Sequence, residues 1–359
     1  MGRETYKAVR LLSVFLLFLA ACVKDKPANT IAPVADTSAS VYVICEGSLG
    51  NGNASLALYN TNNGIHYDEV FLSANNRELG DVFQSMQRIG DRLFLCVNNS
   101  DKVVVINRSD RTLVGTIDIP KPRYILPVSE SKAYVSALFS NKVYIIDPRS
   151  LQVTGSITMP YQNTEGMLLH SGSAYFCTWD TACNKIYEID PVTDVIEQEI
   201  TVAGYAAQEV LVDRFDMLWV LSGNVSKGRP AALTRIDPAS GQVIASYKFP
   251  EKADPIRPVF NNVKDVLYFI EVNYNGGTDN NGIYKMSVRD AVLPQQPFIP
   301  AEKFQYFWAL GIEPVTDRIF VGDPKGFIQK GSVSIYNAQG KRETTFTTGI
   351  GPGHFYFDN

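Results

Sequence analysis

Short runs of alternating apolar and polar residues recur along the chain, separated by turn-forming residues. The pattern is plainest in residues 131–157, whose sequence SKAYVSALFSNKVYIIDPRSLQVTGSI predicts β-strands at 133–138, 142–147 and 152–157. Asp147-Pro148 supplies a turn between the second and third of these strands, because proline fixes φ and aspartate accepts hydrogen bonds from the backbone that follows. One such meander cannot bury its own apolar face, so it needs neighbours built in the same way.

Six further segments repeat this pattern at regular intervals. They are residues 40–70, 90–117, 172–200, 216–249, 265–299 and 317–346. A polar residue closes the second of the three strands in each unit, at Asn60, Asn107, Asp147, Asp190, Asp237, Ser287 and Asn337. Successive units are therefore 47, 40, 43, 47, 50 and 50 residues apart, a spacing typical of four-stranded propeller blades, which repeat about every 40–50 residues.

A further short apolar run next to each unit predicts the innermost strand of a blade. These runs are residues 83–88, 124–128, 166–169, 209–212, 258–261, 307–312 and 353–357. The last run lies at the C-terminus, whereas the first unit begins at residue 40, so the two ends of the chain must share one blade and close the ring. The sequence therefore predicts an all-β fold over residues 40–359, a seven-bladed β-propeller with four antiparallel strands in each blade.

Residues 1–21 have the form of a signal peptide. A basic region precedes the apolar run 11–19, which is short for a membrane span. Leu19-Ala20-Ala21-Cys22 has the form of a lipobox, so we expect cleavage before Cys22 and a lipid on that cysteine; the alternative is an ordinary cleaved signal that contains a cysteine. Residues 22–39 are polar, contain two prolines and predict a flexible tether between the lipid and the propeller.

Export would place the remaining cysteines in an oxidising compartment. Cys177 and Cys183 flank a short loop, so one interpretation is that they form a disulfide, and the other is that both are buried free thiols. Cys45 and Cys96 occupy comparable strand positions in neighbouring blades, and we expect them in the core.

Residues with catalytic chemistry are few. The chain has three histidines, with no pair at metal-ligand spacing, and it contains neither a Gly-x-Ser-x-Gly motif nor a phosphate-binding glycine loop. Only Glu165, Asp254 and His354 are placed to hold a metal near the axis, which keeps a metal-dependent propeller lyase or lactonase as an alternative. The net charge of −4 and the dispersed basic residues disfavour nucleic-acid binding. We therefore expect a non-enzymatic protein with no resident metal or catalytic cofactor.

One face of the predicted ring is rich in aromatic and polar residues. This face is formed by the segments that enter the inner strands and by the loops between the second and third strands, which is where propellers usually bind ligands. The candidate ligand-binding residues are Phe83, Gln84, Arg123, Tyr124, Tyr161, Glu165, Trp179, Tyr205, Gln208, Arg257, Tyr274, Trp308, Phe327 and His354. Aromatic rings beside amide and guanidinium groups suit a large ligand that has both apolar and hydrogen-bonding surface. Some of the rings are expected to fill the axial channel instead, Phe307 first among them.

The repeated motif K-V-x-I-I-D-P, seen at 142–148, resembles that of the YncE-like propeller family. The lipobox followed by V-Y-V-I-C-E-G at 41–47 is similar to surface lipoproteins of Bacteroidetes in that family. Members of the BtuG type capture cobalamin at the cell surface and pass it to an outer-membrane TonB-dependent transporter. The resemblance implies a lipid-anchored protein of the outer membrane, exposed at the cell surface, with cobalamin or a related corrinoid as bound ligand and such a transporter as partner. The remaining alternative is an adhesive or scaffold module that binds glycans or protein through the same face.

Overall fold

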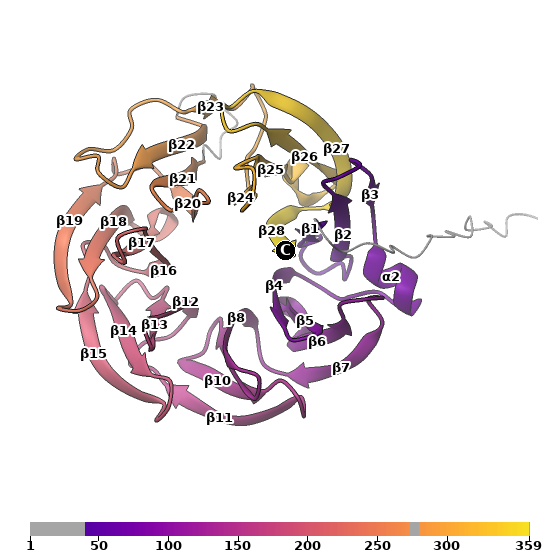
Figure 1. Ribbon diagram of the computed structural model, residues 1–359, viewed down its shortest axis with the longest axis horizontal. Coiled ribbons are helices and arrows are strands. Elements are labelled where there is room, and N and C mark those ends of the chain that lie inside the picture. The colour runs from indigo at the N-terminus through magenta and orange to yellow at the C-terminus, as the bar shows by residue number, and fades with distance from the viewer. Residues whose placement is uncertain (1–39, 273–279, 359) are drawn as a thin grey trace, which may run out of the picture. The chain divides into compact units, whose positions relative to one another are not determined.

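The computed structural model describes residues 40–272 and 280–358, all within the second of two compact units, 1–34 and 35–359. In this part of the chain, seven four-stranded antiparallel sheets are arranged as blades around one axis (Figure 1). The predicted seven-bladed propeller is confirmed. The proposed signal peptide, the lipobox at Cys22 and the tether lie outside the described residues, and so does Tyr274.

Each blade contributes one strand to each of four concentric positions. From the axis outward, the first strands are β28 (Pro352–Asp358), β4 (Phe83–Ile89), β8 (Pro122–Ser129), β12 (Thr164–His170), β16 (Ala207–Val212), β20 (Pro255–Phe260) and β24 (Ala309–Ile312). The second strands are β1 (Ser40–Cys45), β5 (Arg92–Val97), β9 (Lys132–Ala137), β13 (Ser173–Thr178), β17 (Leu218–Asn224), β21 (Val266–Glu271) and β25 (Ile319–Asp323). The third strands are β2 (Ser55–Asn60), β6 (Lys102–Asn107), β10 (Lys142–Asp147), β14 (Lys185–Asp190), β18 (Arg229–Asp237), β22 (Gly282–Ser287) and β26 (Lys330–Tyr336). The outermost strands are β3 (His66–Tyr67), β7 (Leu113–Asp118), β11 (Gln152–Thr158), β15 (Val195–Thr201), β19 (Gln242–Lys248), β23 (Ile299–Pro300) and β27 (Arg342–Ile350).

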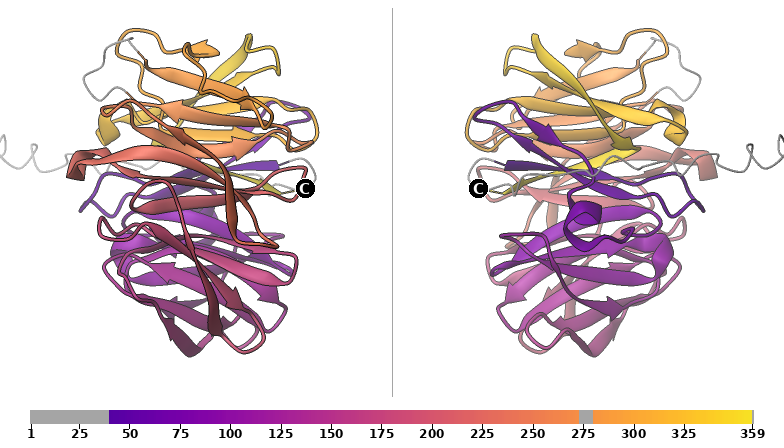
Figure 2. Two further views of the ribbon diagram at one scale, coloured as in Figure 1. Left: turned by 90° about the vertical axis from the view of Figure 1, so that its left-hand side faces the viewer. Right: turned by 90° about the vertical axis from the view of Figure 1, so that its right-hand side faces the viewer.

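Helical structure is confined to short segments of the described chain. The α-helix α2 (Val70–Asn75) follows the two-residue strand β3 and lies at the outer rim of the ring (Figures 1 and 2). The Asn75 side chain bonds Arg111 O and Leu113 N, which ties α2 to the outer strand of the next blade. The 3-10 turns η2 (Asn98–Ser100), η3 (Val225–Lys227) and η4 (Lys325–Phe327) each lie between a second and a third strand. No helix among the described residues has the length and apolar character needed to cross a membrane.

The two ends of the propeller are joined in one blade, as predicted. Strand β28 pairs with β1 along its length, from Ser40 opposite Asp358 to Cys45 opposite Pro352. The side chain of Asp358 is almost fully buried and forms ion pairs with Arg108 (2.7 Å) and Arg88 (3.4 Å) of the neighbouring blade. Closure therefore gives β1 a partner on its inner side, and it is reinforced by ion pairs that span two blades.

The turns between third and fourth strands explain the repeated Asp-Pro and Asp-x-x-Ser/Thr sequences. The Asp147 carboxylate accepts a hydrogen bond from the Arg149 amide and another from the Ser150 hydroxyl. Asp190 and Asp237 make the same pair of bonds to the residues two and three positions further on. An aspartate at the end of the third strand thus fixes the turn that follows it, which is why these residues mark the repeat in the sequence.

The apolar core lies between the faces of neighbouring blades, which Figure 2 shows from the side. One cluster joins Trp219 and Leu233 of one blade to Leu267 and Phe269 of the next, and the other inter-blade clusters are built in the same way. Cys45 and Cys96 are fully buried, as expected. Phe307, which was expected to fill the axial channel, instead packs in an inter-blade cluster.

Candidate functional site

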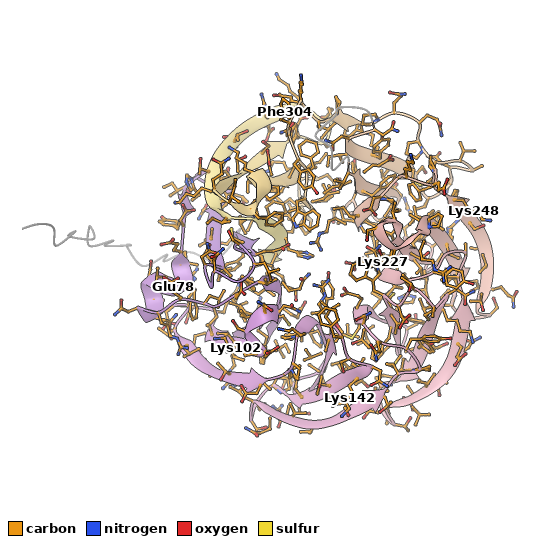
Figure 3. All side chains as sticks on the ribbon, turned by 180° about the vertical axis from the view of Figure 1, so that it is seen from behind. Glu78, Lys102, Lys142, Lys227, Lys248 and Phe304 are labelled. Atoms are coloured by element: carbon orange, nitrogen blue, oxygen red, sulfur yellow. The ribbon has the colours of Figure 1, made fainter. Side chains whose placement is uncertain are left out.

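The axis of the propeller holds a cavity of about 730 Å³ on the face that carries the loops between second and third strands. All seven blades contribute to its lining. The lining residues are Glu46, Leu49, Val82, Gln84, Asn98, Arg123, Tyr124, Leu138, Glu165, Trp179, Gln208, Glu209, Asn224, Val225, Ser226, Lys252, Asp254, Ile256, Arg257 and Trp308. Lys227, in the loop that carries Val225 and Ser226, lies nearer the axis than Lys142 and Lys248 (Figure 3).

The backbone at the start of the inner strands turns polar side chains toward this cavity. The residue just before the strand has positive φ in four successive blades, at Val82 (56°), Lys121 (45°), Asn163 (59°) and Ala206 (57°). The register with the second strand then shifts within the first residues of six of the seven described inner strands, β24 being the exception. Such irregularities re-aim side chains, and here they bring the beginnings of the inner strands together around one space.

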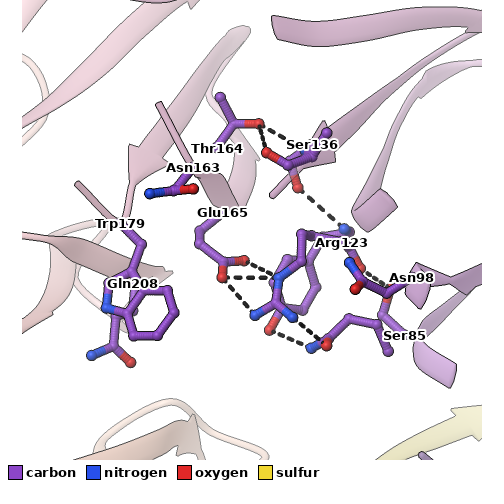
Figure 4. Close-up of polar contacts among 12 residues, drawn as sticks. Ser85, Asn98, Arg123, Ser136, Asn163, Thr164, Glu165, Trp179 and Gln208 are labelled. Carbon is purple, nitrogen blue, oxygen red and sulfur yellow. Dashed lines mark hydrogen bonds and ion pairs between the residues drawn. The ribbon is translucent and has the colours of Figure 1, made fainter. Parts of the chain in front are cut away.

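A buried ion pair between β8 and β12 forms one wall of the cavity. The Arg123 guanidinium donates from Nε to both Glu165 oxygens at 2.9 Å and from Nη2 to Oε1 at 2.5 Å (Figure 4). Its Nη1 donates to the Gln84 carboxamide oxygen. The Glu165 carboxylate raises the pKa of Arg123 against the effect of burial, which alone lowers it. Arg123 is therefore held as a permanent cation, and its donors face protein acceptors.

A second guanidinium, that of Arg257 on β20, is surrounded by groups from four other strands or loops. Its Nη2 lies 3.6 Å from Glu46 Oε1, and its Nη1 contacts His354 Nε2 and lies 3.5 Å from the Tyr124 hydroxyl. Burial and the nearby Arg257 and Arg123 charges hold the pKa of His354 well below its usual value, so the imidazole is neutral and accepts from Arg257. Glu46 also accepts from Trp308 Nε1 at 2.9 Å.

Glu209, on β16, is the third carboxylate of this group, and its surroundings differ. No ion pair to its side chain is found among the described residues, although the Tyr124 hydroxyl hydrogen-bonds to it. Burial and the nearby Glu165 charge outweigh the influence of Arg257 and Arg123 and raise the pKa of Glu209 to about 7. Two arginines therefore face three carboxylates, and the unmatched one is half-protonated near neutral pH.

The structure places eight of the fourteen predicted ligand-binding residues in the cavity wall. They are Gln84, Arg123, Tyr124, Glu165, Trp179, Gln208, Arg257 and Trp308. Phe83 is fully buried beneath the cavity-facing residues, and Tyr161 packs against an inter-blade cluster.

Three further candidates lie near the cavity without lining it. Tyr205 is 39% exposed, and the Arg229 guanidinium stacks on its ring. Phe327 packs edge-on against Trp308, with ring centroids 5.6 Å apart. His354 acts on the cavity through Arg257.

Sequence reasoning missed Glu46 and Glu209. Glu46 begins a loop that was expected on this face, and Glu209 begins a run that was assigned to an inner strand. The available signal was the strand position itself, because Glu209 stands at the start of an inner strand, where a register shift places successive side chains on the cavity wall. Glu165 carried the same signal in the preceding blade.

The disulfide interpretation for Cys177 and Cys183 is wrong, because both residues are free thiols in the structure. The two side chains lie on opposite faces of their blade: Cys177 packs toward the blade that contains Val220, and Cys183 toward the one that contains Tyr134. Cys183 Sγ lies 3.7 Å from the Tyr187 hydroxyl instead. Their closeness in sequence reflects a loop between neighbouring strands, which does not bring the sulfurs onto one side of the sheet.

We expect both thiols to resist alkylation in the folded protein. Both side chains are buried, and burial raises the pKa of the Cys177 thiol well above its usual value, so little reactive thiolate forms. Mass spectrometry after iodoacetamide treatment should show neither Cys177 nor Cys183 modified under native conditions and both modified in denaturant without reductant. A peptide pair still linked in denaturant would contradict the structure.

The three residues proposed as metal ligands do not form a metal site in the described part of the chain. Glu165 is paired with Arg123, and His354 contacts Arg257. Among residues 40–272 and 280–358, no group of three or more histidine, cysteine, aspartate or glutamate side chains is arranged to hold a metal ion.

Comparison with known proteins gives a family and a fold. A family model described as a domain of unknown function (DUF5074) matches residues 39–358, and no curated protein matches the chain. A quinonprotein alcohol dehydrogenase-like protein of Bacteroides thetaiotaomicron is 14% identical, with 90% of this chain and 79% of that chain covered and a TM-score of 0.68. Hydrazine synthase of Kuenenia stuttgartiensis is 14% identical, with 76% and 90% covered and a TM-score of 0.60. A streptogramin B lyase is 11% identical, with 84% and 86% covered and a TM-score of 0.57. At these identities the likeness to the solved structures extends to the fold alone.

Proposed function

The chain belongs to the DUF5074 family, and from this premise we propose that its propeller is a non-enzymatic module that binds a ligand in the axial cavity. The observation that carries the proposal is the cavity itself, about 730 Å³ in volume and lined from all seven blades. Cavities of this size, with aromatic walls and a few fixed polar groups, are typical of small-molecule sites.

The arrangement of the cavity wall supports binding rather than turnover. Trp179, Trp308 and Tyr124 offer flat apolar surface, and the amides of Gln84 and Gln208 line the same cavity. The side chains of Arg123, Glu165, Arg257 and Glu46 are held in ion pairs, which orient them and engage them with one another. A ligand with apolar edges and several hydrogen-bonding groups fits these surroundings.

For the ligand we propose cobalamin or a related corrinoid, captured for an outer-membrane TonB-dependent transporter. The support is the resemblance of the repeat and of the lipobox to surface lipoproteins that capture cobalamin, together with a cavity that offers partners to side-chain amides. In this proposal the protein is anchored in the outer membrane by a lipid on Cys22, with the cavity face open to the ligand.

Isothermal titration with cyanocobalamin tests the proposal. We expect saturable binding at one site, with the ligand recovered unchanged, and about tenfold or greater weakening in Trp179→Ala because a large aromatic contact is lost. Phe215→Ala is the matched control, since Phe215 is exposed in a turn between a first and a second strand, on the opposite face.

Each outcome decides a separate part of the proposal. Heat no greater than that of dilution for the wild-type protein would remove the corrinoid assignment. A glycan array then tests whether the same aromatic wall binds sugars. Equal affinity in wild type and Trp179→Ala would move the binding site away from the axial cavity.

A further inference from the structure

Both guanidinium groups of the inner cavity wall already contact acceptors within the protein. Both arginines are held, Arg123 by Glu165 and Gln84, and Arg257 by Glu46, His354 and the Trp308 carbonyl. The carboxylates among these partners partly neutralise both guanidinium groups, so an anionic ligand would compete with them for either cation.

Four neutral side chains of the wall also donate hydrogen bonds to the protein. The indole N–H groups of Trp179 and Trp308 donate to Gly223 O (3.0 Å) and Glu46 Oε1 (2.9 Å). The Gln208 amide nitrogen donates to Gly223 O at 2.7 Å, and the Asn98 amide nitrogen to Pro122 O at 3.1 Å. Since each indole has a single N–H, the aromatic walls offer a ligand surface but no further donor.

The acceptors of the wall are left in excess. Glu209 has four acceptor sites on its carboxylate, one hydrogen bond from Tyr124 and no ion pair among the described residues. The adjacent Gln208 donates from its amide nitrogen to Gly223 O. Its carboxamide oxygen takes no part in that bond. Of the lining cations in the described chain, Lys252 alone has no ion pair, and it lies in an exposed turn where water solvates it.

A ligand complementary to this wall brings N–H donors and no negative charge. We propose that Glu209 is the residue that anchors and selects the ligand, and that the ligand presents an amine or primary amide to it. This inference rests on the proposed binding function and narrows the class of ligand. The position of this buried carboxylate in the cavity wall, without an ion pair among the described residues, supports the proposal, because a donor from the ligand would stabilise the ionised form that burial disfavours.

Three indole compounds of similar size separate the classes by one functional group. Tryptamine carries an ammonium group, indole-3-acetamide a primary amide and indole-3-acetate a carboxylate. Titrations followed by ligand-observed NMR at millimolar concentrations should show saturable binding of the first two and none of the third. This comparison uses the wild-type protein alone, so it does not depend on any variant folding.

Glu209→Gln tests the residue itself. Glutamine has nearly the same shape but no negative charge, so we expect the affinity for tryptamine to fall about tenfold or more, the effect of losing a hydrogen bond to a charged group. Glu130→Gln is the control, because it removes a similar charge from an exposed turn on the opposite face. Its affinity for tryptamine should equal that of wild type.

The inference fails if indole-3-acetate binds as tightly as tryptamine, if Glu209→Gln binds tryptamine as wild type does, or if neither N–H compound binds. These outcomes are separable from those of the proposed function. Cyanocobalamin bound equally by wild type and Glu209→Gln would overturn the role of Glu209 while leaving corrinoid capture in place. If tryptamine and indole-3-acetamide bind, indole-3-acetate does not, and cyanocobalamin does not bind either, the role of Glu209 stands and corrinoid capture is overturned.

Discussion

Replacing Glu165 with alanine is expected to lower the free energy of unfolding by about 3–5 kcal/mol, because it leaves the buried Arg123 guanidinium without its carboxylate. The Glu165 side chain is 4% exposed and that of Arg123 16% exposed, and three short hydrogen bonds join them. Urea denaturation followed by tryptophan fluorescence measures the change.

A matched pair at the surface provides the control for this prediction. Arg149 and Glu130 are also joined at 2.5 Å, but their side chains are 64% and 85% exposed. Since water solvates both partners after truncation, Glu130→Ala should change the free energy of unfolding by about 0.5 kcal/mol or less. Similar losses in Glu165→Ala and Glu130→Ala would show that the axial pair is solvated rather than buried.

The double variant Arg123→Met with Glu165→Leu separates pairing from packing. Removing both charges removes the uncompensated cation, so this variant should be clearly more stable than Glu165→Ala alone. If it is no more stable, the uncompensated Arg123 charge is not the source of the loss in Glu165→Ala. Ligand binding by the double variant then reports whether the pair also shapes the binding wall.

The architecture could be predicted from the sequence because it is repeated seven times. Each unit carries the same alternation of apolar residues and closes the third strand of its blade with a polar residue such as Asp147 or Asp190, so errors in one unit are corrected by the others. The hydrogen bonds of these aspartates to the following turn show why that position is marked. The short helix α2 has no counterpart in the other described units, so no repeated pattern predicts it.

The members of the candidate site were harder to predict, because strand bulges decide which side chains face the axis. Gln84, Arg123 and Gln208 were identified because they lie at the beginning of inner strands, which are the strands nearest the axis. The structure places all three in the cavity wall. Glu209 follows Gln208 directly, and in a regular strand one of two successive residues would face away from the axis. The register shift between Ala207 and Glu209 brings both to the cavity wall.

A related limit explains the errors at Phe307 and at the two cysteines. Alternation says that neighbouring residues point to opposite faces, but in a propeller both faces of every sheet are covered by other blades. Phe307 therefore had a buried place between blades as well as one at the axis. Cys177 and Cys183 are both buried for the same reason, in cores on opposite sides of one sheet.

Glu209→Gln is expected to be more stable than wild type at alkaline pH and equally stable at acidic pH. The pKa of Glu209 is raised from 4.5 to about 7 in the folded protein. Between these two values the unfolded chain has released the proton while the folded protein still holds it, so wild-type stability falls as the pH rises through this window. Glutamine has no such proton to lose. The difference should grow from near zero at about pH 4 to about 3 kcal/mol at about pH 8.

The groups that face Glu209 set this window. Arg257 on β20 and Arg123 and Tyr124 on β8 favour its ionised form, whereas burial and Glu165 on β12 oppose it. Glu271 on β21 has its pKa raised to about 7 by burial and by Asp254, so wild-type stability alone would combine two groups, and the comparison with Glu209→Gln isolates one.

Urea denaturation of wild type, Glu209→Gln and the surface control Glu130→Gln across this pH range measures the effect. If the difference in the free energy of unfolding between Glu209→Gln and wild type does not change with pH, Glu209 is solvated and its ionisation does not destabilise the folded protein. The expected growth of that difference would identify a carboxylate that the fold keeps in the cavity against its own stability. In our proposal the ligand accounts for this cost, because its N–H donor stabilises the ionised carboxylate that burial disfavours.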